Sequence, residues 1–115
     1  MTHRDDKIYL QHIIEAIGQI EEYMTGGDLK QFSETKLLQD GVIRQLEIIG
    51  EATKNISIQT RKKAPSIPWK SIAGMRDKLI HQYFGVDIDA VWTTVTQDLP
   101  VLKKAVITLI KESSQ

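Results

Sequence analysis

Several features that define common protein classes are missing from this sequence. It has no cysteine, which excludes disulfide bonds and zinc sites built on thiolates. No stretch approaches the roughly 20 apolar residues that a membrane-spanning helix needs. The first residues, Met1 to Lys7, are charged and lead into no apolar segment of the signal-peptide type. We therefore expect a cytoplasmic protein that does not associate with a membrane.

Familiar catalytic and metal-binding motifs are missing as well. His3, His12 and His81 do not have the spacing of a helical metal site, and H-E-x-x-H does not occur. Gly26-Gly27 is not followed by the Lys-Ser/Thr pair of a phosphate-binding loop. No pattern supports a serine or cysteine nucleophile. The sequence thus predicts no metal site and no cofactor.

Helical periodicity dominates what is present. The length of 115 residues and a hydrophobic fraction of 41% fit one globular domain over residues 1–115. A first helix is predicted from about residue 5 to just before Gly26-Gly27, because apolar residues recur there at steps of three and four. Asp28 is predicted to cap the next turn, with Gln31 as its partner.

Further helices are predicted along the rest of the chain. A second long helix carries Leu38 to Ile56 at steps of three and four, and its two glycines, Gly41 and Gly50, suggest close approach of another backbone. A short helical turn follows over 57–63, a third long helix over about 69–81, and a further one over 88–97 capped by Asp87. Asp98-Leu99-Pro100 is predicted to start the last helix anew. With no strand pattern, the fold class is all-α: an antiparallel bundle of four main helices plus one or two short ones.

Charge is balanced overall but not along the chain. Acidic and basic residues number 15 each, yet residues 54–81 contain seven basic side chains and one acid, a net charge of +6. A local basic patch of this kind can contact phosphate on one face of a neutral protein. The candidates for RNA contact are Lys70, Lys78, Arg61, Lys62 and Lys63. The alternative for the Arg61-Lys62-Lys63 run is a solvated loop.

One segment carries a more specific pattern. Arg76, His81 and Tyr83 form R-x-x-x-x-H-x-Y, which resembles the signature of HEPN-domain ribonucleases. The surroundings are similar to the HepT toxin branch of that superfamily, and the similarity covers nearly the whole chain in order: Gly50-Glu51-Ala52, Ile67-Pro68-Trp69, Gly74-Met75-Arg76-Asp77, Tyr83-Phe84-Gly85-Val86-Asp87, Val91-Trp92 and Asp98-Leu99-Pro100.

The resemblance implies a HEPN-like bundle that forms a homodimer and cuts RNA without a metal ion. It also implies the toxin of a type VII-like toxin–antitoxin system, neutralised when a partner nucleotidyltransferase antitoxin attaches AMP. By position, Arg76 and His81 match the catalytic pair, and Tyr83 matches the tyrosine that receives AMP. The chain departs from many relatives at Asp77, where they have asparagine, and a carboxylate at this place would repel RNA phosphate.

The chemistry of the matched residue types fits RNA cleavage. Histidine exchanges a proton near neutral pH, so it can serve as general base or acid. Arginine stays charged and offers forked donors to phosphate oxygens. One motif histidine and one motif arginine per chain are few for this reaction, and a two-fold dimer would supply two of each residue. Positions five apart on an ideal helix differ by about 140°, so the pair converges if the helix loosens near His81 or if Arg76 reaches across.

Two residues are predicted to support this pair, and other functions remain open. Asp77, four residues before His81, would orient the imidazole, while Glu51 either points at the site or faces solvent. Trp69 and Trp92 are interpreted as packing residues. The alternative function is a non-catalytic HEPN-like dimer that binds a nucleotidyltransferase, a nucleotide or RNA. A third interpretation is a purely structural helical dimer.

Overall fold

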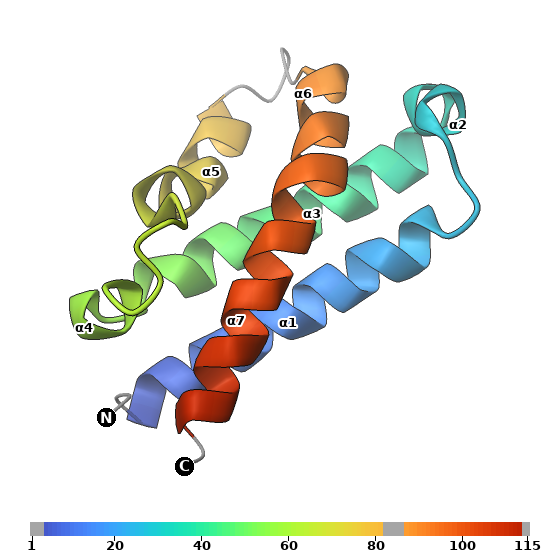
Figure 1. The fold of residues 1–115 in the computed structure, drawn as a ribbon. Coiled ribbons are helices and arrows are strands. Elements are labelled where there is room, and N and C mark those ends of the chain that lie inside the picture. The colour runs from blue at the N-terminus through green and yellow to red at the C-terminus, as the bar shows by residue number, and fades with distance from the viewer. Residues whose placement is uncertain (1–3, 82–86, 114–115) are drawn as a thin grey trace.

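The apolar stripe near the start of the chain forms helix α1 (Arg4–Met24) (Figure 1). The computed structural model describes the backbone of residues 4–81 and 87–113, and the side chains of residues 5–75 and 87–113. Leu10, Ile13 and Ile20 of α1 are fully buried. The helix ends where Gly26 adopts a left-handed φ of 73°, a conformation that glycine takes without steric cost. The predicted first helix and its end are confirmed.

The next two helices meet at a tight corner. Asp28 caps α2 (Leu29–Glu34) by accepting a hydrogen bond from the Gln31 backbone N–H at 2.9 Å. Helix α3 (Lys36–Lys54) follows after Thr35. The Gln39 side chain donates to the Phe32 and Ser33 carbonyls, so the last turn of α2 is bound to the first turns of α3. The predicted cap and the second long helix are confirmed.

Gly41 has a different explanation from the predicted one. A Cβ atom at this position would lie 3.2 Å from Cε2 of Tyr23, which is tighter than ordinary van der Waals contact. Within the chain, the close neighbour is therefore an aromatic side chain of α1 and not another backbone, while close approach across a dimer stays a prediction. Gly50, by contrast, is buried in α3, and the close approach of another backbone stays a prediction for it.

A buried polar cluster connects the beginning of α1 to α4 (Ile58–Arg61). Asp6 is 2% exposed, and its carboxylate accepts hydrogen bonds from the Ser57 backbone N–H at 2.8 Å, the Ser57 hydroxyl and the Thr60 hydroxyl at 2.6 Å. Ser57 also caps α4 by accepting from the Thr60 N–H. The short helical turn predicted over 57–63 is confirmed, and its orientation is set by a carboxylate about 50 residues earlier in the chain.

The last part of the chain is one continuous helical segment and not two helices. Asp87 caps α6 (Ile88–Thr93) as predicted. A turn of π-helix, η1 (Thr94–Asp98), then leads directly into α7 (Leu99–Ser113). The Leu99 N–H donates to the Thr94 carbonyl five residues back. The predicted new start at Asp98-Leu99-Pro100 is wrong, because this wider turn lets Pro100, which has no N–H, follow without breaking the helix.

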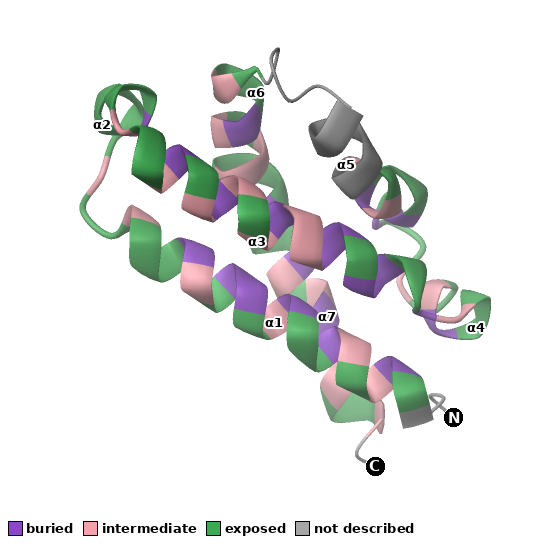
Figure 2. Ribbon diagram, turned by 180° about the vertical axis from the view of Figure 1, so that it is seen from behind, coloured by how far each residue is buried: buried purple, intermediate pink, exposed green. Residues whose placement is uncertain are grey.

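The four long helical segments build one bundle. Helix α3 packs against α1 on one side and α5 (Trp69–His81) on the other, while α7 crosses α1. Figure 2 views α1 and α3 from behind and shows buried residues along the sides of both helices where they meet their neighbours. The described residues are helical with no strand, so the predicted all-α bundle is confirmed. None of the described helices is long and apolar enough to cross a membrane.

Candidate active site

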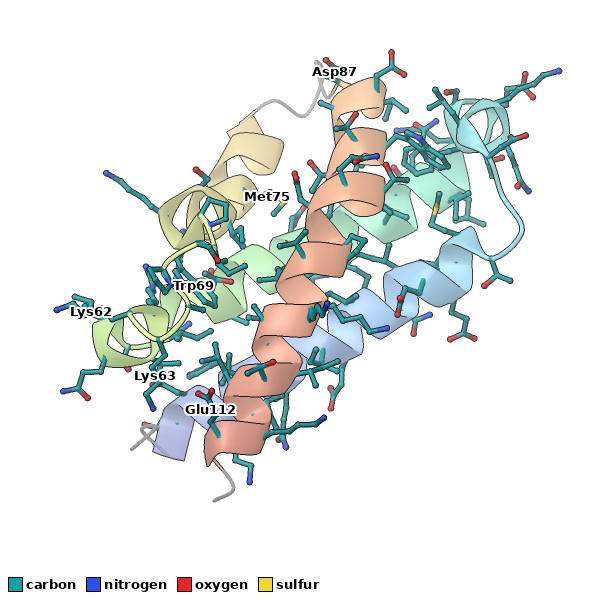
Figure 3. All side chains as sticks on the ribbon, viewed as in Figure 1. Lys62, Lys63, Trp69, Met75, Asp87 and Glu112 are labelled. Atoms are coloured by element: carbon teal, nitrogen blue, oxygen red, sulfur yellow. The ribbon has the colours of Figure 1, made fainter. Side chains whose placement is uncertain are left out.

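The helix that carries the Arg–His motif is held at its beginning by a tryptophan. Helix α5 starts after Pro68, and the Trp69 indole N–H donates to the carbonyls of Arg61, at 3.1 Å, and Ala64, at 2.9 Å. Trp69 is 6% exposed and Ile72 is buried one turn later. Figure 3 shows Trp69 beside the segment that joins α4 to α5. Trp69 is thus the predicted packing residue, and its hydrogen bonds fix the loop before α5.

Arg76 and His81 both belong to α5, which stays helical through His81. Their backbone positions therefore differ by about 140° around the helix axis. The side chains of Arg76, Asp77, Lys78 and His81 lie outside the described set, as does all of Tyr83. The catalytic pair, the supporting Asp77 and the modification of Tyr83 therefore stay predictions.

The basic residues before α5 divide into two groups. The Arg61 guanidinium donates to the Thr53 carbonyl at 2.7 Å and to the Ile56 carbonyl at 3.1 Å. Thr53 lies in the last turn of α3, whose carbonyls have no intrahelical partner, and Ile56 lies two residues beyond the end of the helix. Arg61 therefore has a structural role, and a contact with RNA stays a prediction for it.

The lysines around Arg61 are placed differently. Lys62, Lys63 and Lys70 are all exposed. Figure 3 shows Lys62 and Lys63 at the α4 end of the molecule, with Lys62 extending away from the bundle. Because Arg61 and Trp69 tie the end of α3, α4 and the start of α5 together, these lysines sit on a braced segment. A solvated face and a phosphate-binding face both fit this placement.

Glu51 is exposed on α3 and lines a groove between α3 and α1. The groove has a volume of about 340 Å³, and His12 and Tyr9 of α1 form its other wall. The structure therefore brings Glu51 together with these α1 side chains. Among the residues with described side chains, no three histidine, aspartate or glutamate side chains are arranged to hold a metal ion.

Comparison with known proteins decides the family. A family model described as Ribonuclease HepT-like matches residues 13–109. This chain belongs to the HepT-like ribonuclease family. The match includes the whole of α5 and reaches into α7, so the resemblance based on the motif segment and its surroundings is confirmed.

Individual relatives agree with this assignment. The chain is 51% identical, over 100 residues, to a protein of Thermococcus cleftensis named probable ribonuclease HepT; the alignment covers 87% of this chain and 91% of that protein. It is 49% identical over 109 residues to a Methanocaldococcus jannaschii protein named as a gamma-glutamylcyclotransferase and candidate RNase. That alignment covers 95% of this chain but 49% of the relative, so the chain spans about half the length of that protein. No solved structure gives a significant match.

Two features of this HepT-like chain were not predicted from its sequence. The Asp6–Ser57–Thr60 cluster has only a weak signal, a serine three residues before a threonine at a helix start. The groove beside Glu51 has a clearer sequence signal. Tyr9 and His12 are three residues apart on α1, and Arg44, Glu51 and Asn55 are spaced so that they fall on one side of α3 and its C-cap.

Proposed function

We propose that this chain is a ribonuclease that cuts RNA without a metal ion. The observation that carries the proposal is the family match over residues 13–109, which includes the α5 segment with Arg76 and His81. The relatives named as ribonucleases support the same activity. The oligomer we propose is a homodimer, because the motif supplies a single arginine and a single histidine per chain, and a two-fold axis would place two of each at a shared site.

The proposed reaction uses the two side chains in different roles. A histidine takes the proton of the ribose 2′-OH, whose oxygen attacks the neighbouring phosphorus while the bond to the 5′-oxygen breaks. That leaving oxygen takes up a proton from a general acid, a role that the second histidine of the dimer can fill. Arg76 holds the phosphate oxygens and stabilises the negative charge that grows on them in the transition state. Lys62, Lys63, Lys70 and Lys78 are the proposed contacts to the rest of the RNA backbone.

We further propose that the enzyme is the toxin of a type VII-like toxin–antitoxin pair. Its partner would be a nucleotidyltransferase antitoxin that transfers AMP to the Tyr83 hydroxyl. Tyr83 follows His81 by two residues, so an attached nucleotide would crowd the space that RNA must enter. Its phosphate would also compete with RNA for the donors of Arg76.

The test is cleavage of RNA by the purified chain in excess EDTA. We expect cleavage to persist in EDTA, and we expect Arg76→Ala and His81→Ala each to slow it about 100- to 10,000-fold. Circular dichroism should show unchanged helix content in both variants. Activity that disappears in EDTA and returns with magnesium would overturn the metal-independent mechanism. RNA binding with no cleavage would favour the non-catalytic binding module instead.

A further inference from the structure

The groove between α1 and α3 combines two aromatic rings with several hydrogen-bonding groups. The Tyr9 and His12 rings meet edge to face, with centroids 5.9 Å apart and an angle of 89° between their planes. The groove of about 340 Å³ has room for a flat heterocycle beside them. Helix α3 and its C-cap residue add four polar side chains to the lining: Arg44, Glu47, Glu51 and Asn55.

Most polar groups in this groove accept hydrogen bonds. The carboxylates of Glu47 and Glu51 accept only, and each has about four lone-pair sites, so neither needs to be without another partner to receive a ligand. Asn55 already uses its Nδ2 to donate to the Glu51 carbonyl at 2.9 Å, which presents its Oδ1 as a further acceptor. A ligand that fits these groups has to present several N–H donors close together.

The charges of the groove orient such a ligand. The two carboxylates that line the groove repel a phosphate, so a nucleotide would enter base first. Arg44 lies at the rim with its side chain 70% exposed and its Nη1 3.8 Å from Glu47 Oε2. Its guanidinium can therefore meet a phosphate that stays outside the groove.

We infer that this groove is a subsite for one unstacked guanine base of an RNA substrate. Guanine presents two adjacent donors, N1–H and N2–H, which match the two oxygens of one carboxylate, as no other RNA base does. Single-stranded RNA is commonly read in this way, by stacking a base on an aromatic ring and hydrogen bonding its Watson–Crick edge. The inference rests on the proposed function, since it names the base that the ribonuclease would read.

The first experiment measures binding of free nucleotides to the full chain by NMR chemical-shift titration. We expect GMP to shift the resonances of Tyr9, His12 and Glu51, and AMP, CMP and UMP to bind about tenfold more weakly or less. Glu51→Gln should remove the preference for GMP, because an amide offers one acceptor and one donor in place of two acceptors. His12→Ala should weaken all four nucleotides together. Glu34→Gln, on the exposed face of α2, is the matched control and should change nothing.

The second experiment uses RNA. A short oligouridine with one central guanosine should bind more tightly than oligouridine alone, and sequencing of cleavage products should place cuts at a constant distance from guanosine. Equal binding of the four nucleotides, or shifts outside the groove only, would overturn the guanine subsite. So would GMP binding without tighter binding of the guanosine-containing RNA.

The experiments distinguish failure of the guanine subsite from failure of the proposed ribonuclease activity. Cleavage that ignores guanosine would remove the subsite and leave the ribonuclease intact. Selective GMP binding by a chain that cuts no RNA would remove the ribonuclease and leave the guanine site.

Discussion

Replacing Asp6 by alanine should destabilise the fold more than any other change to an acidic side chain of α1. The Asp6 carboxylate accepts three hydrogen bonds, and a hydrogen bond to a charged group typically contributes about 1.5–3 kcal/mol. Thr60 is 1% exposed, so its buried hydroxyl loses the acceptor at 2.6 Å and keeps only the longer contact, at 3.3 Å, with the Ser57 hydroxyl. Ser57 is half-buried, so water recovers part of the loss there.

The net magnitude follows from these terms. The summed contribution of the three hydrogen bonds is an upper bound, because water solvates Ser57 in the variant and the variant no longer buries a charge. We therefore expect a loss of about 3 kcal/mol in the free energy of unfolding. For a domain whose total stability is about 5–15 kcal/mol, this is a large fraction. A small protein loses about 1–3 kcal/mol of stability per molar urea, so the unfolding midpoint should fall by about 1–3 M.

Urea unfolding followed by circular dichroism measures this effect. Asp5→Ala is the matched control, because Asp5 is exposed in the same turn of α1, and it should change stability by at most about 1 kcal/mol. In a double-mutant cycle, Asp6→Ala with Thr60→Val should show a coupling of about 1 kcal/mol or more. A loss below 1 kcal/mol for Asp6→Ala, or no coupling to Thr60, would falsify the idea that this cluster anchors α4.

Three further predictions concern the proposed ribonuclease. Tyr83→Phe should stay toxic when the nucleotidyltransferase partner is co-expressed, and intact-mass spectrometry should find AMP on the original chain but not on the variant; a mass shift that persists in Tyr83→Phe would assign the modification elsewhere. Lys62→Ala and Lys70→Ala should each weaken RNA binding and lower the slope of log K against log salt by about 0.7, while Lys30→Ala on α2, which is also exposed, should leave the slope unchanged. Sedimentation velocity at micromolar concentration should show a dimer, and a fully active monomer would contradict the shared site.

Much of the fold was predictable because its signals are local. Asp28 and Asp87 cap the helices that they precede in the sequence, and Gly26 ends α1 through its own backbone conformation. Tyr23 against Gly41 was not predictable, since two residues 18 apart meet only when α1 and α3 pack. Arg61 was assigned by its charge, whereas its two carbonyl partners depend on how α4 folds back on the end of α3.

The candidate site was predictable only in part, for a related reason. The motif spacing identified the family, which the family match confirms. It also put Arg76 and His81 on one helix, which α5 confirms. Spacing along one helix says nothing of which side chains other helices bring beside it. The groove of Tyr9, His12 and Glu51 arises from two helices about 40 residues apart in the chain, and neither helix indicates it alone.

The π-turn between α6 and α7 is a place where the chain should tolerate the deletion of one residue. Val91 and Leu99 are both buried although they are eight residues apart, which on a regular α-helix would set them about 80° out of line. The extra residue held in η1 absorbs this offset, so the two act as if they were seven apart. Deleting Gln97, which is exposed, would convert the turn to regular helix and keep Leu102, Val106 and Leu109 facing the core. The same deletion in the middle of α7 would rotate everything beyond it by about 100° and turn core residues to solvent.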